Sequence, residues 1–167
     1  MIPKGIKVTY YMLWFFLGHE VLSLARYSGV TDYVILENAG CGCLFFAFVI
    51  VSILLNAVAL KYIKEPAGIG LITSLIYLAV ALAGNLLVFF FILGDVELAK
   101  EAYVESRQSR GLPVRDDAIS FMFSSSGIYM SMAILMFIRF IPALLIVWNK
   151  EYFLKTRETE LRSGGLR

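Results

Sequence analysis

The sequence predicts an all-α integral membrane protein: one membrane domain, residues 1–167, folded as a four-transmembrane-helix bundle with an extra amphipathic outer helix between spans three and four. Composition is the first observation behind this. Of the 167 residues, 59% are hydrophobic and 17% are charged, with mean hydropathy +0.77. A soluble domain is usually about 45–50% apolar and about 25% charged. The excess of apolar side chains therefore has to face lipid.

The second observation is a set of four apolar runs, each near the roughly 20 residues that cross about 30 Å of hydrocarbon. We expect the spans at residues 8–27, 39–60, 67–94 and 118–148. The runs are continuous and do not alternate, which excludes a β-barrel. Each run must satisfy its own backbone hydrogen bonds in lipid, so each is expected to be a helix.

The third observation is the distribution of basic residues, which predicts orientation because cytoplasmic segments are rich in lysine and arginine. Four spans place nine basic residues on the side of both termini, and five on the other side. The expected location is therefore the cell membrane, with the N- and C-termini cytoplasmic. The net charge of +2 is too small to indicate nucleic acid as a partner.

Outside the spans, residues 95–110 predict the outer helix. Asp95 is a suitable N-cap, apolar residues recur at helical spacing, and Gly111 and Pro113 follow where the helix should stop. Asp116 and Asp117 are expected to cap span four. The basic tail, residues 149–167, is expected to continue as a helix and to rest against anionic headgroups.

Ionisable residues inside spans are functional-site candidates by default. At 1.5 Å per residue, Glu20, His19 and Asn85 should form an outer polar layer. Asn56 and Arg139 should form an inner layer, with an apolar middle between the two. Of the neighbours His19 and Glu20, one should face the bundle interior.

Each layer has a functional and a structural interpretation. Glu20 is either a carboxyl group that exchanges protons or a neutral group hydrogen-bonded to Asn85 or to a carbonyl. Arg139 either binds an anion or a lipid headgroup, or it extends to the inner interface with its charge in water.

Two further patterns have alternatives of the same kind. Cys41 and Cys43, at the expected outer mouth of span two, are either a redox pair or two small apolar residues in a tight helix start; no metal set accompanies them. Small residues on span four indicate a packing face, within the bundle or toward another subunit: Ser120, Ser124, Gly127 and Ser131.

Two resemblances follow from these patterns. The layout of four spans, a cysteine pair at the mouth of span two and an outer helix before span four resembles the bacterial disulfide-bond oxidases, which pass electrons to quinone. The family has Cys-x-x-Cys and a second pair, whereas this chain has Cys-x-Cys and no second pair. Spans one to three are also similar to an uncharacterised family of short prokaryotic membrane proteins, through His19, Glu20, the Glu37-Asn38 motif, and the series Tyr77, Val80 and Asn85.

Without an enzyme signature, the first hypothesis is a non-catalytic subunit or scaffold of a larger membrane complex, in contact with lipid and with other subunits or further copies of itself. The second is a small proton-coupled transporter or channel centred on Glu20. The third is thiol redox chemistry at Cys41 and Cys43, the only hypothesis that requires a quinone cofactor.

Overall fold

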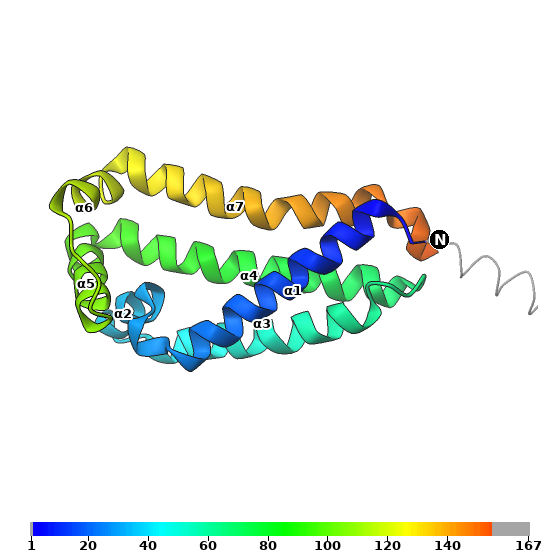
Figure 1. The fold of residues 1–167 in the computed structure, drawn as a ribbon, viewed down its shortest axis with the longest axis horizontal. Helices are drawn as coiled ribbons and strands as arrows, with labels where there is room; N and C mark the ends of the chain where they lie inside the picture. The colour runs from blue at the N-terminus through cyan, green and yellow to red at the C-terminus, as the bar shows by residue number, and fades with distance from the viewer. Residues whose placement is uncertain (1, 155–167) are drawn as a thin grey trace, which may run out of the picture.

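The computed structural model describes residues 2–154, and this part of the chain is all-helical (Figure 1). Its elements, in chain order, are α1 (Lys4–Ala25), η1 (Tyr27–Gly29), α2 (Thr31–Asn38), α3 (Gly42–Tyr62), α4 (Gly68–Gly94), α5 (Val96–Ser109), α6 (Asp116–Met122) and α7 (Ser125–Trp148).

Four long helices, α1, α3, α4 and α7, run side by side, and α2, α5 and α6 gather at one end of them, here called the cap end (Figure 1). The N-terminus and the α3–α4 connection lie at the opposite end, here called the terminal end. Among the described helices, α3, α4 and α7 are long and apolar enough to cross a membrane. The α1 helix has 22 residues, and at 1.5 Å per residue it is about 33 Å long.

Two apolar cores hold the helices together. The core at the terminal end joins Ile6 and Leu13 of α1 to Ile63, to Tyr77 of α4 and to Ile146 of α7, all of them with no exposed surface. The Tyr152 hydroxyl also donates a hydrogen bond to the carbonyl of Lys64. These contacts fix the first half of α1 against α7 and the α3–α4 connection.

The second core lies at the cap end and includes residues from 26–38, the segment that the sequence predicts as a short loop between the first two spans. Residues 26–38 form η1 and α2, and Val34, Ile35 and Leu36 of α2 are buried. They pack in one cluster with Phe45 of α3 and with residues of α4 and α5. The short helix is stable in this place because its apolar residues complete a core with three other helices, and not because of its own length.

The expected continuous fourth span, residues 118–148, is wrong in its first part. The chain breaks at Phe123 and Ser124 into α6 and α7. The Ser124 Oγ donates to the carbonyl of Phe121 at 2.6 Å and accepts from the backbone N–H of Gly127 at 3.1 Å. Ser124 therefore caps α7, whereas Asp116 and Asp117 belong to the first turn of α6.

The break also divides the expected packing face. Ser120 is exposed on α6, while Gly127 and Ser131 lie on α7. Gly127 packs against the backbone carbonyls at the end of α6, so its small size serves the α6–α7 junction. The expectation of one continuous stripe of small residues along span four is therefore wrong.

The helix expected over residues 95–110 is confirmed as α5, residues Val96–Ser109, with the Asp95 side chain accepting from the Leu98 N–H at 3.0 Å. Gly111 follows it with φ +65°, a conformation that glycine adopts without the steric cost of a Cβ. Helix resumes at residues 150–154 beyond Asn149. The rest of the expected tail helix lies outside the described residues.

Candidate ligand-binding pocket

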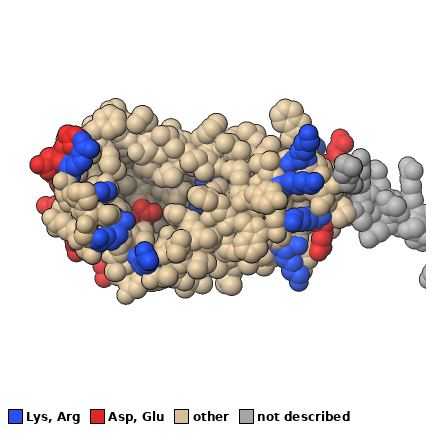
Figure 2. Space-filling view, in the orientation of Figure 1, with Lys and Arg blue, Asp and Glu red and all other residues tan. Residues whose placement is uncertain are grey.

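A cavity of about 500 Å³ lies in the cap-end half of the bundle. Its walls come from α1, α2, α3 and α4, with Arg110 from beyond α5 and Arg139 as the contribution of α7. Figure 2 shows a hollow on the visible face near the cap end, with acidic atoms inside it and basic atoms around its rim. Its volume falls within the roughly 300–1,000 Å³ that is usual for small-molecule sites.

The floor of the pocket holds a buried polar cluster from three helices. The Tyr77 hydroxyl of α4 donates to Glu20 Oε1 of α1 at 2.8 Å. Arg139 of α7 donates from Nη1 to the Tyr77 oxygen at 2.7 Å, and its Nη2 lies 3.6 Å from Glu20 Oε1. Tyr77 is 0% exposed and Glu20 is 6% exposed. We call these three residues the Glu20 cluster.

The Glu20 cluster corrects the expectation of two separate polar layers. Arg139 was assigned to the inner layer and Glu20 to the outer layer, yet they form an ion pair. The guanidinium lies 4.1 Å over the ring of Phe16, a contact that favours a cation held inside the bundle. The interpretation in which Arg139 extends to the interface is therefore wrong.

Asn56, the other residue assigned to the inner layer, lies beside the carboxyl group of Glu20. It is fully buried, and its Nδ2 donates to the carbonyl of Leu13 at 3.0 Å. This bond ties α3 to α1 about two turns before Glu20. The role of Asn56 in the structure is thus to hold α1 in place beside the pocket.

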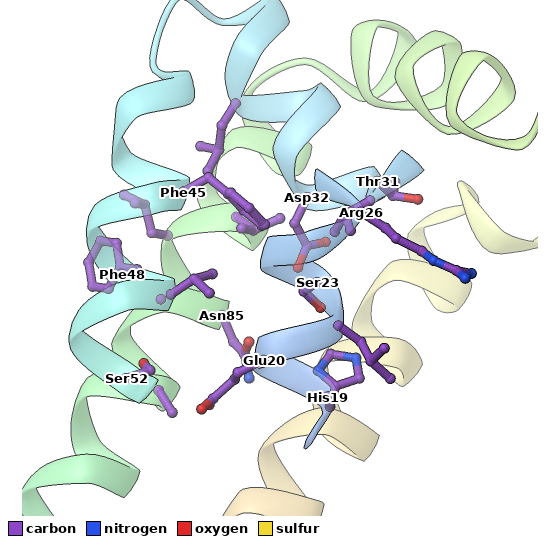
Figure 3. A pocket seen from close by; sticks show the side chains of 18 of the residues that line it. His19, Glu20, Ser23, Arg26, Thr31, Asp32, Phe45, Phe48, Ser52 and Asn85 are labelled. Atoms are coloured by element: carbon purple, nitrogen blue, oxygen red, sulfur yellow. The ribbon is translucent and has the colours of Figure 1, made fainter. Parts of the chain in front are cut away.

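One acceptor of the Glu20 cluster has no partner. Glu20 Oε2 is buried and receives no hydrogen bond from the described residues. Figure 3 shows the Glu20, Asn85 and Ser52 side chains directed into the same part of the pocket, from α1, α4 and α3. An unpaired buried acceptor costs about 1–3 kcal/mol, and Asn56, whose Oδ1 is also buried without a partner, is a polar side chain beside it.

The rim of the pocket carries charges of both signs: His19, Arg26, Asp32 and Arg110. The Arg110 side chain is anchored by Nε donating to the Ser106 carbonyl at 2.8 Å. Asp32, at the start of α2, is exposed and lines the pocket. Desolvation by the surrounding protein raises the pKa of its carboxyl group, and the charge of His19 opposes this effect.

The structure brings together four of the residues singled out in the sequence, because His19, Glu20, Asn85 and Arg139 all line the pocket. Of the neighbours on α1, Glu20 is buried and His19 is exposed. Sequence reasoning missed Tyr77 as the interhelical partner of Glu20, for which it named Asn85 or a carbonyl. The available signal was a lone phenolic hydroxyl near the middle of an otherwise aliphatic stretch.

The two cysteines lie apart from the pocket lining. Cys41 is half-buried at the N-cap of α3 and Cys43 is exposed, and both are free thiols. Within residues 2–154, no three His, Cys, Asp or Glu side chains gather in a way that could hold a metal ion.

The comparisons add no relative to this picture. The chain matches none of the protein-family models, curated proteins or solved structures with which it was compared.

Proposed function

We propose that this chain is a four-span membrane protein that binds a small polar ligand in the cap-end pocket, with Glu20 as the central binding group, and that it works as a carrier for that ligand. The observation that supports this most directly is Glu20 Oε2, a buried acceptor without a partner at the floor of a 500 Å³ cavity. A bundle that served only to pack helices would gain stability by filling this space with apolar side chains.

The four-span arrangement is supported by the position of α1 within the bundle. Of its ionisable residues between Val8 and Ala25, Glu20 faces the interior, where it bonds to Tyr77 and pairs with Arg139, and His19 lies at the rim of the pocket. The exposed side chains of α1 include Trp14, Phe15 and Val21. Lipid-facing apolar groups and inward-facing charges are the pattern of a spanning helix. In this arrangement α1, α3, α4 and α7 cross the membrane.

The orientation in this proposal places the terminal end in the cytoplasm. Nine lysines and arginines belong to that end in the sequence and five to the cap end, in accordance with the bias of cytoplasmic segments toward basic residues. The pocket then opens in the outer half of the membrane, under α2 and α5.

The test compares bound small molecules in four versions of the full chain by native mass spectrometry. Ser23→Phe fills the pocket from α1, and Glu20→Gln removes the charge. Val21→Phe is the matched control, since Val21 is 47% exposed on the same helix and outside the pocket lining.

We expect a bound non-protein mass in the wild type and in Val21→Phe. It should be absent in Ser23→Phe and at least tenfold less abundant in Glu20→Gln. The same bound masses in all four versions, or none in the wild type, would reject the proposal.

A second candidate function is proton-coupled transport, favoured by the ion pair between Glu20 and Arg139 in the Glu20 cluster. A proton placed on Glu20 would remove the charge that Arg139 pairs with, at 3.6 Å, and would free both side chains to move. The test is pH-dependent flux in proteoliposomes, read with a trapped pH-sensitive dye. Flux that Glu20→Gln abolishes would support this candidate, and flux equal to that of empty liposomes would reject it.

The hypothesis of a non-catalytic subunit stays a prediction with its own measurement. It requires other chains that co-purify at fixed stoichiometry. A lone chain or homo-oligomer that binds ligand as proposed above would contradict it.

A further inference from the structure

A second cavity, of about 210 Å³, adjoins the pocket on the side of α7. The two cavities share Thr31, Asp32, Asn85 and Val88 in their linings. The second cavity is otherwise mostly apolar, with walls from α4, α6 and α7. We call it the apolar groove, and its apolar lining includes Ile35, Phe89, Ile92, Phe123, Ile128 and Leu135. A polar chamber and an apolar groove thus adjoin each other at these four residues.

The face between α1 and α7 is open toward the cap end. The two helices touch near the terminal end, where Gly5 lies close to Leu145 and Asn149, and again where Arg139 covers Phe16. Beyond this point α1 slants away from α7 (Figure 1), and the hollow of Figure 2 lies between them. In the proposed membrane arrangement this opening faces the lipid, with the charged rim of the pocket toward the headgroups at the cap end.

From this geometry we infer that the ligand of the pocket is a single-chain amphiphile with a neutral, hydroxyl-bearing head, which enters sideways from the lipid between α1 and α7, places its head at Glu20 and lays its chain in the apolar groove. The inference rests on the proposed function and names the class of ligand for that site.

The head chemistry follows from the floor of the pocket. Glu20 Oε1 already accepts a hydrogen bond from Tyr77 and is paired with Arg139. A cationic head would therefore find no unpaired negative charge there. Oε2 needs a donor, while Asn85 and Ser52, which line the same chamber, can both donate and accept. A hydroxyl group is the small neutral head that donates to Oε2 and accepts from the other two.

The chain preference follows from the groove. Its apolar side chains would otherwise face disordered lipid, and a ligand bound at Glu20 fixes one chain beside them. The gain in binding free energy over bulk lipid comes from the head of the ligand, because lipid tails are as apolar as the groove itself. The inference therefore predicts that a head able to donate hydrogen bonds is required for the groove to be occupied selectively.

The experiment places a single tryptophan in the groove and measures its quenching by a brominated ligand. The background is the full chain with Trp14→Phe and Trp148→Phe, in phosphatidylcholine nanodiscs. Phe89→Trp reports on the groove, and Tyr103→Trp on its opposite wall replaces it if the first variant does not fold. Phe137→Trp is the control, because Phe137 is 65% exposed and lines neither cavity.

The probe is monoolein brominated at mid-chain. We expect the groove tryptophan to reach half-quenching at a mole fraction at least ten times lower than the control tryptophan. The methyl ester of the same brominated acid, which has the chain without a donor head, should quench both tryptophans alike. Equal quenching of both tryptophans by monoolein, or equal selectivity of the methyl ester, would overturn the inference.

Failure of the inference can be separated from failure of the proposed function by adding Ser23→Phe to the groove reporter. Selective quenching that Ser23→Phe abolishes supports the inference. Selective quenching that persists shows a lipid site independent of Glu20 and overturns it. In the absence of selective quenching, a bound mass that Ser23→Phe removes in native mass spectrometry would keep the proposed function while this inference falls.

Discussion

The Tyr77 hydroxyl donates a hydrogen bond of 2.8 Å to Glu20 Oε1 across 57 positions of sequence, and the same hydroxyl oxygen accepts from Arg139. One phenol thus links a carboxylate of α1 to a guanidinium of α7. Because Tyr77 has no exposed surface, water does not replace it when it is removed. Its loss leaves both charged groups short of a partner.

Tyr77→Phe should therefore lower the free energy of unfolding by about 1–2 kcal/mol, between the modest strength of most interhelical bonds in membranes and the cost of an unpaired buried group. The measurement is reversible unfolding by titration with SDS in mixed micelles. Tyr129→Phe is the matched control, since Tyr129 is 59% exposed on α7, and it should leave the free energy unchanged. An equal loss in both variants would contradict the role given to the Tyr77 hydroxyl.

The Glu20–Arg139 ion pair leads to a second prediction: the losses in the free energy of unfolding from substituting its two members should not be additive. Arg139→Gln leaves the Glu20 charge unpaired in the bundle and should cost about 3 kcal/mol. Glu20→Gln combined with Arg139→Gln removes both charges and should recover at least about 1 kcal/mol of that loss. A double variant whose loss equals the sum of the single losses would show that the pair does not act as a unit.

The long helices were predictable because hydrocarbon imposes one requirement on each of them. An apolar run of sufficient length must satisfy its own backbone, and α3 and α4 match the expected runs closely. The α5 helix was predictable for a different reason, since Asp95 and Gly111 mark its two ends with local chemistry. Both inferences needed only neighbours in sequence.

The α2 helix and the α6–α7 break depend on neighbours in space. Val34, Ile35 and Leu36 are three apolar residues in a segment too short to identify as a helix, and Phe45 and Val88 make their burial favourable. The break at Ser124 lies inside the fourth apolar run, far from the proline of that run, Pro142, which lies within α7. Its cause is the hydrogen bonding of the Ser124 side chain to Phe121 and Gly127. The sequence does not distinguish this serine from a serine inside a helix.

The Glu20 cluster escaped prediction because depth was counted along upright helices. That count separates Glu20 from Arg139, whereas the slant of α1 (Figure 1) and the length of the arginine side chain bring their charged atoms within 3.6 Å. Depth along a helix places a Cα atom, and a long side chain extends well beyond it. Tyr77 at the crossing point then completes the contact.

Asp32 makes a prediction about pH. Desolvation raises the pKa of its carboxyl group in the folded protein, so the folded state binds this proton more tightly than the unfolded state does. The contribution to stability therefore grows as the pH falls through the raised pKa toward the ordinary value of about 3.9. Above the raised pKa the charged carboxylate lowers the stability of the fold.

Asp32→Asn should accordingly increase the midpoint temperature of unfolding at neutral pH, and its advantage over the wild type should shrink as the pH falls toward 4. The measurement is thermal unfolding in detergent across this range, read as the difference between variant and wild type. Asp116→Asn, on the exposed surface of α6, is the control for removal of one acidic charge. A difference that grows on acidification would contradict the sign worked out here.

The free thiols make a prediction about the function itself. Neither Cys41 nor Cys43 lines the pocket or the groove, so Cys41→Ser with Cys43→Ser should leave the bound mass in native mass spectrometry unchanged. Alkylation of Cys43, which is exposed, should also leave the bound mass unchanged. Loss of the bound ligand in either case would favour the thiol redox hypothesis over the proposed function.

Gly127 tests the junction that shapes the apolar groove. A Cβ at this position would clash with the carbonyl oxygen of Phe121 and would lie 2.8 Å from that of Met122. Both are backbone atoms of α6, so relief requires the two helices to move apart. Gly127→Ala should lower the free energy of unfolding by about 1–3 kcal/mol, the usual range for overpacking a tight site.

The matched control for Gly127→Ala is Gly18→Ala on α1, where a Cβ would meet nothing within 4 Å. This substitution should be neutral or stabilising by up to about 1 kcal/mol, since alanine favours the helix over glycine. The readouts are unfolding in SDS and quenching of the groove tryptophan by brominated monoolein. Because Met122, Phe123 and Ile128 flank the junction and line the groove, Gly127→Ala should also weaken selective quenching, whereas Gly18→Ala should not. Unchanged stability and unchanged quenching in Gly127→Ala would show that the α6–α7 junction does not set the width of the groove.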